Sequence, residues 1–253
     1  MGDRDLFVIP YNKCAVTLLG HVLAGIAGYA VGFIVFWVFY QVLFFSLIVA
    51  GIFVPIAISI NIASSKKRRL VRLLRQFQSL LESLVVSLQA GSPDLKAFNH
   101  ALDDMILMYS DSADIVKETK LMMAKFASRI SIGEALMDFA ERSGLEDIRL
   151  FASVYMAVEG KGEKTSEIVI RSQKILSDKI TIQSEIKAMS SGAVMEINIM
   201  LVIPVVIVFI MGSVGGEMME ALFTPVGHVV ATVAIAIFVI AYAIGRKMVN
   251  IKV

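Results

Sequence analysis

The sequence has little of what most catalytic and metal sites are made from. It contains one cysteine (Cys14), three histidines, one tryptophan and five prolines in 253 residues. A single cysteine excludes a disulfide framework and a cysteine-rich metal site. The net charge of +2 gives no overall indication of nucleic-acid binding. Charged residues make up only 18% of the chain and hydrophobic residues 57%, which is too apolar for a water-soluble protein or a disordered one.

Charge is absent from one long stretch near the start of the chain. The 52 residues 14–65 contain no Asp, Glu, Lys or Arg. A bilayer core of about 30 Å needs roughly 20 apolar helical residues. The stretch therefore predicts two membrane spans, Val16–Phe39 and Val42–Ala63, which reverse near Tyr40-Gln41. Trp37 and Tyr40 fit an interfacial aromatic belt. The stretch is too long for the apolar region of a cleaved signal peptide.

A second apolar block closes the sequence. It predicts spans at Ala193–Val214 and Val226–Gly245, joined by residues 215–225 with two acids, two glycines and a proline. Lys and Arg flank both termini and the central block, while the two short loops between spans have none. The positive-inside rule then places the termini and the central block in the cytoplasm.

The predicted fold is an all-α membrane protein. Two N-terminal and two C-terminal transmembrane helices flank a cytoplasmic antiparallel bundle of about six helices. The expected segments are a cytoplasmic N-terminus, a span hairpin, the helical domain, a span pair with a short external loop, and a basic tail, at residues 1–15, 16–63, 64–192, 193–245 and 246–253.

Apolar residues in the central block recur at spacings of three and four, which predicts helices. The first stripe includes Leu70, Leu73, Leu74, Phe77, Leu81, Leu84, Val85 and Leu88. Ser92 is expected as the N-cap of the next helix, whose stripe begins at Leu95. Ser131–Glu134 fits a capping box. Further helices are expected at residues 112–128 and 146–159 and from Thr165, the last possibly continuing into the third span. Four glycines are expected at turns: Gly91, Gly144, Gly160 and Gly162.

Motifs typical of catalytic or ligand-binding sites are incomplete in this sequence, because their residues do not have the required spacing. Residues 159–165 resemble a phosphate-binding loop, but Glu163 separates Gly162 from Lys164 and no strand precedes the segment. The histidines are not at ligand spacing, and no nucleophile elbow occurs. We therefore expect no catalytic residue, no cofactor and no metal. Cys14 is interpreted as a small interfacial residue or a lipidation site.

Two groups of polar residues remain as candidate contact sites. The basic cluster after the second span is expected to fix topology and meet anionic lipid, or alternatively to bind an acidic soluble partner; it comprises Lys66, Lys67, Arg68, Arg69, Arg72 and Arg75. Glu196 and Asn198 are the polar residues of the third span. The Glu196 carboxylate is expected to reach the interface or pair with Lys187, or to contact another subunit or span.

Several motifs resemble the F domain of type II secretion systems. Residues 88–98 resemble its "L-x-A-G-x-x-x-x-x-A" turn, and residues 131–144 resemble its "S-L-x-E-A-L … F-A-x-x-x-G" helix. Residues 147–162 resemble its next helix and glycine turn, although the turn is more charged here. The ending at 248–253 is similar to the TadB branch of tight-adherence (Tad) pilus systems.

This resemblance implies an inner-membrane platform protein without catalysis of its own. Its implied partners are a cytoplasmic secretion or pilus ATPase, a paralogous platform subunit, a pilin and membrane lipid, in a homo- or hetero-oligomer. The alternative is a small four-span transporter or channel with a cytoplasmic regulatory domain. That alternative predicts several polar groups at membrane depth, where this sequence has Glu196 and Asn198. A membrane-bound enzyme is disfavoured because no His, Cys and carboxylate set converges.

Overall fold

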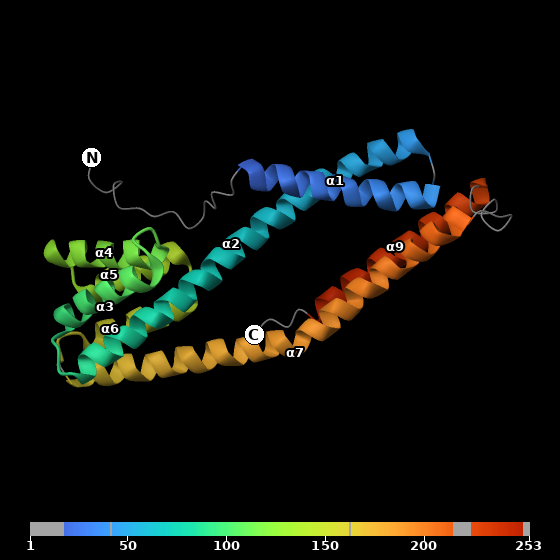
Figure 1. Cartoon of the computed structure of the whole chain (residues 1–253). Coiled ribbons are helices and arrows are strands. Elements are labelled where there is room, and N and C mark those ends of the chain that lie inside the picture. Colours follow the sequence, from blue (N-terminus) through green and yellow to red (C-terminus); the bar gives the residue numbers. More distant parts are fainter. Residues whose placement is uncertain (1–17, 41, 162, 215–223, 250–253) are drawn as a thin grey trace. The chain divides into compact units, whose positions relative to one another are not determined.

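The computed structural model describes residues 18–40, 42–161, 163–214 and 224–249 (Figure 1). These residues form eight helices and no strand, which confirms the all-α class predicted from the sequence. The helices are α1 (Leu18–Tyr40), α2 (Leu43–Gln89), α3 (Asp94–Tyr109), α4 (Asp114–Ala127), α5 (Ile132–Ser143), α6 (Glu146–Val158), α7 (Glu163–Val214) and α9 (Pro225–Val249).

Four of these helices are long and apolar enough to cross a membrane: α1, α2, α7 and α9. A break between helices falls where the reversal is predicted, because α1 ends at Tyr40 and α2 begins at Leu43. The second span and the first helix of the central block are a single helix of 47 residues. The third span likewise continues the last helix of the block, in a helix of 52 residues.

The chain divides into two compact units. The first, here called the helical body, covers Ser64–Ile182, and the second, here called the membrane unit, covers Val16–Ala63 with Gln183–Val253. The helical body contains α3 to α6 together with the C-terminal part of α2 and the N-terminal part of α7. These six helical segments match the expected number of helices in the central block.

The helical body has its own apolar core. The α2 stripe supplies Leu73, Phe77, Leu81 and Leu84, each at most 1% exposed, and Leu70, Leu74 and Val85 pack at its margin. The Phe77 ring makes edge contacts with two rings, Phe139 at 6.1 Å and Phe151 at 5.5 Å between centroids. Aromatic pairs in this geometry add about 0.5–1.5 kcal/mol each beyond the area they bury.

Two details of the predicted helical pattern are wrong. Ser92 was expected at the N-cap of α3, but Pro93 occupies that position and no side chain caps the helix. The fixed φ of proline suits a residue that precedes a helix, so Pro93 starts α3 without a serine cap. Leu95 was expected in the inward stripe but is 40% exposed, because the buried face of α3 is formed by Ala97, Phe98, Ala101 and Met105.

Glycine ends three helices where the backbone must turn left-handed. At the end of α2, Gly91 has φ +78° and its N–H bonds Leu88 O, while the N–H of Ser92 bonds Ser87 O. This pair of bonds is a Schellman motif. Gly144 follows α5 at φ +67°, and Gly160 follows α6 at φ +77°. Gly91, Gly144 and Gly160 thus each have a left-handed backbone after a helix end, and Gly162 lies outside the described residues.

Glycine also permits close packing within the membrane unit. A Cβ on Gly28 would lie 2.5 Å from the Cβ of Ala57, and one on Gly32 would lie 2.9 Å from the Phe53 ring. The four-residue spacing of these glycines lets the α1 and α2 backbones approach, as small residues do between membrane helices. Helices α1 and α9 also meet, where the Tyr40 hydroxyl lies 2.6 Å from the Thr232 hydroxyl.

Candidate functional site

The basic cluster lies on α2, and its members differ in solvent exposure and in ion pairing. Lys67, Arg68, Arg72 and Arg75 are exposed. Arg69 instead makes a two-pronged ion pair with Asp114 at the start of α4, with its Nε 2.8 Å from Oδ2 and its Nη2 2.7 Å from Oδ1. Lys66 is half-buried.

The pairing of Arg69 with Asp114 has a structural consequence. Asp114 is in the first turn of α4, where a carboxylate also complements the helix dipole. The ion pair therefore ties the start of α4 to α2. The exposed members of the cluster remain candidates for contact with lipid or with a partner, as the sequence predicts.

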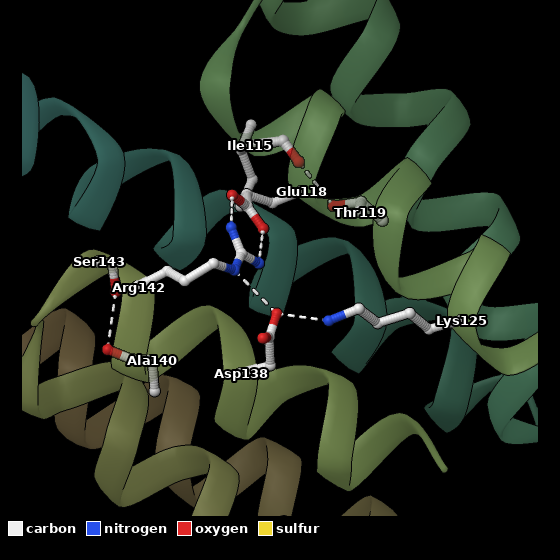
Figure 2. A network of polar contacts seen from close by, with 8 residues as sticks. All are labelled: Ile115, Glu118, Thr119, Lys125, Asp138, Ala140, Arg142 and Ser143. Atoms are coloured by element: carbon white, nitrogen blue, oxygen red, sulfur yellow. Dashed lines mark hydrogen bonds and ion pairs between the residues drawn. The ribbon is translucent and has the colours of Figure 1, made fainter. Parts of the chain in front are cut away.

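A buried ion-pair network joins α4 to α5 (Figure 2). The Glu118 side chain is 0% exposed, and both of its oxygens accept hydrogen bonds from Arg142, Nη1 to Oε1 and Nη2 to Oε2 at 2.6 Å each. The Nε of Arg142 donates to Asp138 Oδ2 at 2.8 Å. The same Asp138 oxygen accepts from Lys125 Nζ at 2.5 Å, so the network returns to α4.

These contacts shift the protonation equilibria of the network. Burial alone would lower the pKa of Arg142, but its hydrogen bonds to Glu118 and Asp138 raise that pKa above its ordinary value. Burial would raise the pKa of Asp138, but the bonds from Lys125 and Arg142 outweigh it and lower that pKa. Arg142 and Asp138 are therefore both charged at neutral pH.

Pattern analysis of the sequence missed this network. Glu118 and Arg142 are 24 residues apart on different helices, so neither periodicity nor motif spacing connects them. One signal was present: Glu118 lies between Ile115 and Met122 at the helical spacing of three and four, and both neighbours are buried. A charged residue on an apolar stripe needs a buried partner.

A carboxylate directly after α6 caps the start of α5. Glu159 Oε1 accepts from the N–H of Ile132 at 2.8 Å, and Oε2 accepts from the N–H of Gly133 at 3.2 Å. Ser131 Oγ accepts from the N–H of Glu134, which confirms the N-cap expected for Ser131. A Cβ on Gly133 would lie 2.4 Å from Met156 Cγ and 2.8 Å from the Glu159 carboxylate. Glycine is therefore required where α5 meets α6.

Tyr155 and Asp94 form a second polar contact near this corner. The Tyr155 side chain is 1% exposed, and its hydroxyl donates a long bond of 3.5 Å to Asp94 Oδ2. Burial raises the pKa of Tyr155, and the charges of Asp94 and Glu159 raise it further. Burial also raises the pKa of Asp94, although the Tyr155 hydroxyl partly offsets this.

Glu196 and Asn198 lie on the α7 segment of the membrane unit, and both are exposed. Within the part of the chain that the structure describes, neither makes a hydrogen bond or an ion pair, so the expected pairing of Glu196 with Lys187 is not seen there. The described residues also contain no cluster of three metal-ligating side chains. Cys14 lies outside them.

The helical body and the four candidate spans define a helical membrane protein organised around packing and ion pairs. The sequence profile of the family "Type II secretion system (T2SS), protein F" matches residues 80–212, which is more than half of the chain. The chain belongs to this family. Searches of curated proteins and of solved structures return no match.

Proposed function

We propose that the chain is an inner-membrane platform protein of a Tad-type type IV pilus or a related secretion machine. In this role it couples a cytoplasmic ATPase to the extraction of pilins from the bilayer and to pilus assembly, and it catalyses no reaction itself. The observation that carries the proposal is the family match over residues 80–212, in a chain whose long apolar helices precede and follow the helical body. The Tad branch rests on the resemblance of residues 248–253.

The proposed topology follows from the distribution of basic residues. Lys and Arg flank each span at the end next to the helical body or to a chain terminus, and Lys67, Arg68, Arg72 and Arg75 are exposed on α2. Each basic residue near an anionic leaflet contributes about 1 kcal/mol of attraction. We place the helical body and both termini in the cytoplasm, with the exposed basic side chains against lipid headgroups.

The topology has a direct test with cysteine labelling in intact cells. The single native thiol is removed by Cys14→Ser, and Ser112→Cys in the helical body or Thr224→Cys beside α9 supplies a new one. An impermeant maleimide should label Thr224→Cys in intact cells and Ser112→Cys only after permeabilisation. The reverse pattern would place the helical body outside and end the proposal.

The proposed coupling runs through the two longest helices. Residues of α2 and α7 belong to both the helical body and the membrane unit, without a break in either helix. Inside the helical body, Lys179 of α7 bonds Asp147 of α6 at 2.6 Å, and Gln78 of α2 bonds Ser177 of α7 at 3.3 Å. A displacement of the bundle by a motor would therefore be transmitted along both helices.

Insertions into α7 test this coupling. Gly-Gly-Ser placed after Glu185 interrupts the helix, whereas seven alanine-rich residues at the same point lengthen it by about two turns and nearly preserve its facing. In a strain deleted for the gene, we expect wild type to restore surface pilin and the flexible insertion to fail at normal protein level. The helical insertion should retain more activity.

Two results would contradict the proposal. Normal piliation in the deletion strain would remove the platform role itself. Equal piliation with the flexible and the helical insertion would leave the platform role standing but remove the coupling through α7. Cross-linking of the complex in membranes then identifies its partners, expected to be the ATPase, a paralogous platform subunit and the pilin.

A further inference from the structure

The covered face of α7 in the membrane unit is defined by its neighbours. Val205 and Val208 pack against a buried cluster from α1 and α9. Ile197 lies on the same face, because its Cδ1 would be 3.3 Å from a Cβ on Gly245 of α9. Val194 and Ile197 are correspondingly half-buried.

Glu196 and Asn198 flank this covered face on opposite sides. Each is one residue from Ile197, and each residue turns the helix by about 100°, so the two side chains project on either side of the α7–α9 contact. They differ by only about 3 Å along the helix axis. Both are exposed, so neither flank is occupied by α1 or α9.

An exposed carboxylate and amide are costly in a lipid-facing helix. Insertion scales assign roughly 2.5–3.5 kcal/mol to a central acidic residue, and less near the edge. A carboxylate accepts hydrogen bonds and the NH2 group of the Asn198 amide donates them, so the two side chains can pair. Within one chain they point apart, whereas between two copies in the same membrane they lie at matching depth.

We infer that copies of this chain assemble head to tail in the membrane, with the Asn198 amide of one copy donating to the Glu196 carboxylate of the next. A two-fold contact through this flank would instead place Glu196 against Glu196, which repels. A contact between different faces repeats around a ring until it closes. The inference requires α7 to lie in a membrane but does not depend on a role in pilus assembly.

Cysteine cross-linking of the full-length chain in native membranes tests the arrangement. Met200 and Val202 lie one helical turn beyond Glu196 and Asn198, on the same two flanks, and are 64% and 55% exposed. In a Cys14→Ser background, Met200→Cys with Val202→Cys should give a ladder of oligomers on oxidation, whose highest band counts the subunits. Either substitution alone should give mainly monomer. The exposed α9 pair Ile237→Cys with Val239→Cys controls for random collision.

The contribution of Glu196 and Asn198 to association is tested in the chain that carries Cys14→Ser, Met200→Cys and Val202→Cys. Glu196→Leu and Asn198→Leu should each weaken association by about 3- to 30-fold, the range measured for hydrogen bonds between membrane helices. Glu196→Gln, which keeps an acceptor, should retain most of the association. Energy transfer between labelled copies under increasing lipid dilution measures the change.

Four outcomes overturn the inference. They are a dimer from Met200→Cys alone without a ladder, an unchanged ladder in both leucine variants, a cross-link only to a different protein, and no cross-link in chain that is inserted in the membrane. None of these depends on piliation, so the platform role is tested separately.

Discussion

Replacing Arg142 by methionine should destabilise the protein strongly, because it leaves the Glu118 carboxylate buried without its partner. The Glu118 side chain is 0% exposed and receives two bonds of 2.6 Å from the guanidinium. Breaking such a pair from one side costs about 3–5 kcal/mol. Replacing both charges by apolar groups of similar size is often nearly neutral. Adding Glu118→Met to Arg142→Met should therefore restore stability.

The assay is thermal unfolding of the full-length protein in detergent, with hydrogen exchange of the α4 and α5 amides. Arg142→Met should lower the melting temperature by about 6–20 °C and speed exchange in both helices. Arg149→Met is the matched control, because Arg149 meets Glu146 at 3.8 Å on the surface and should cost less than about 1 kcal/mol. A double variant no more stable than Arg142→Met would refute the reasoning.

Two further substitutions test other contacts in the helical body. Gly133→Ala should cost about 1–3 kcal/mol, because its Cβ would overlap Met156, whereas Gly192→Ala on α7 meets open space and should be neutral or stabilising in the same melting assay. Asp138→Asn should cost about 0.2–1 kcal/mol at pH 7, because the Asp138 side chain is 40% exposed. Since pairing lowers the pKa of Asp138 below 3.8, this contribution is present above that pH and should disappear as the pH falls further. A wild-type advantage over Asp138→Asn that does not shrink as the pH falls below 3.8 would contradict this assignment.

Much of the fold was predictable because two signals in the sequence are strong. Absence of charge marks the spans, and the spacing of Leu73, Phe77 and Leu84 marks a helix face. Both depend on residues close together in the chain. The Glu118–Arg142 pair and the Glu159 cap on α5 depend on residues 24 to 27 positions apart, whose proximity follows only from helix packing.

The boundary between the second span and the helical body shows the same difference between what the sequence marks and what the backbone does. The sequence marks the change from apolar to basic near Ser65, and that change was interpreted as the start of a domain. In the structure α2 passes through it without a break. A change of side-chain polarity is a change of surroundings, whereas a helix ends only where its backbone is capped or turned. Gly91 supplies that turn, 26 residues after Ser65, and no comparable signal lies at the boundary itself.

The two units place their polar groups in opposite ways, and this bears on how the protein would work. The helical body buries Glu118 and Arg142 against each other, so its strongest polar contacts are satisfied internally and fix one packing of α4 on α5. The membrane unit exposes Glu196 and Asn198 on a largely apolar stretch of α7. A body that satisfies its own polar groups is suited to move as one piece, while spans with unsatisfied ones are suited to association. Under the proposed function, force would enter the body as a rigid displacement and be resisted by the assembled spans.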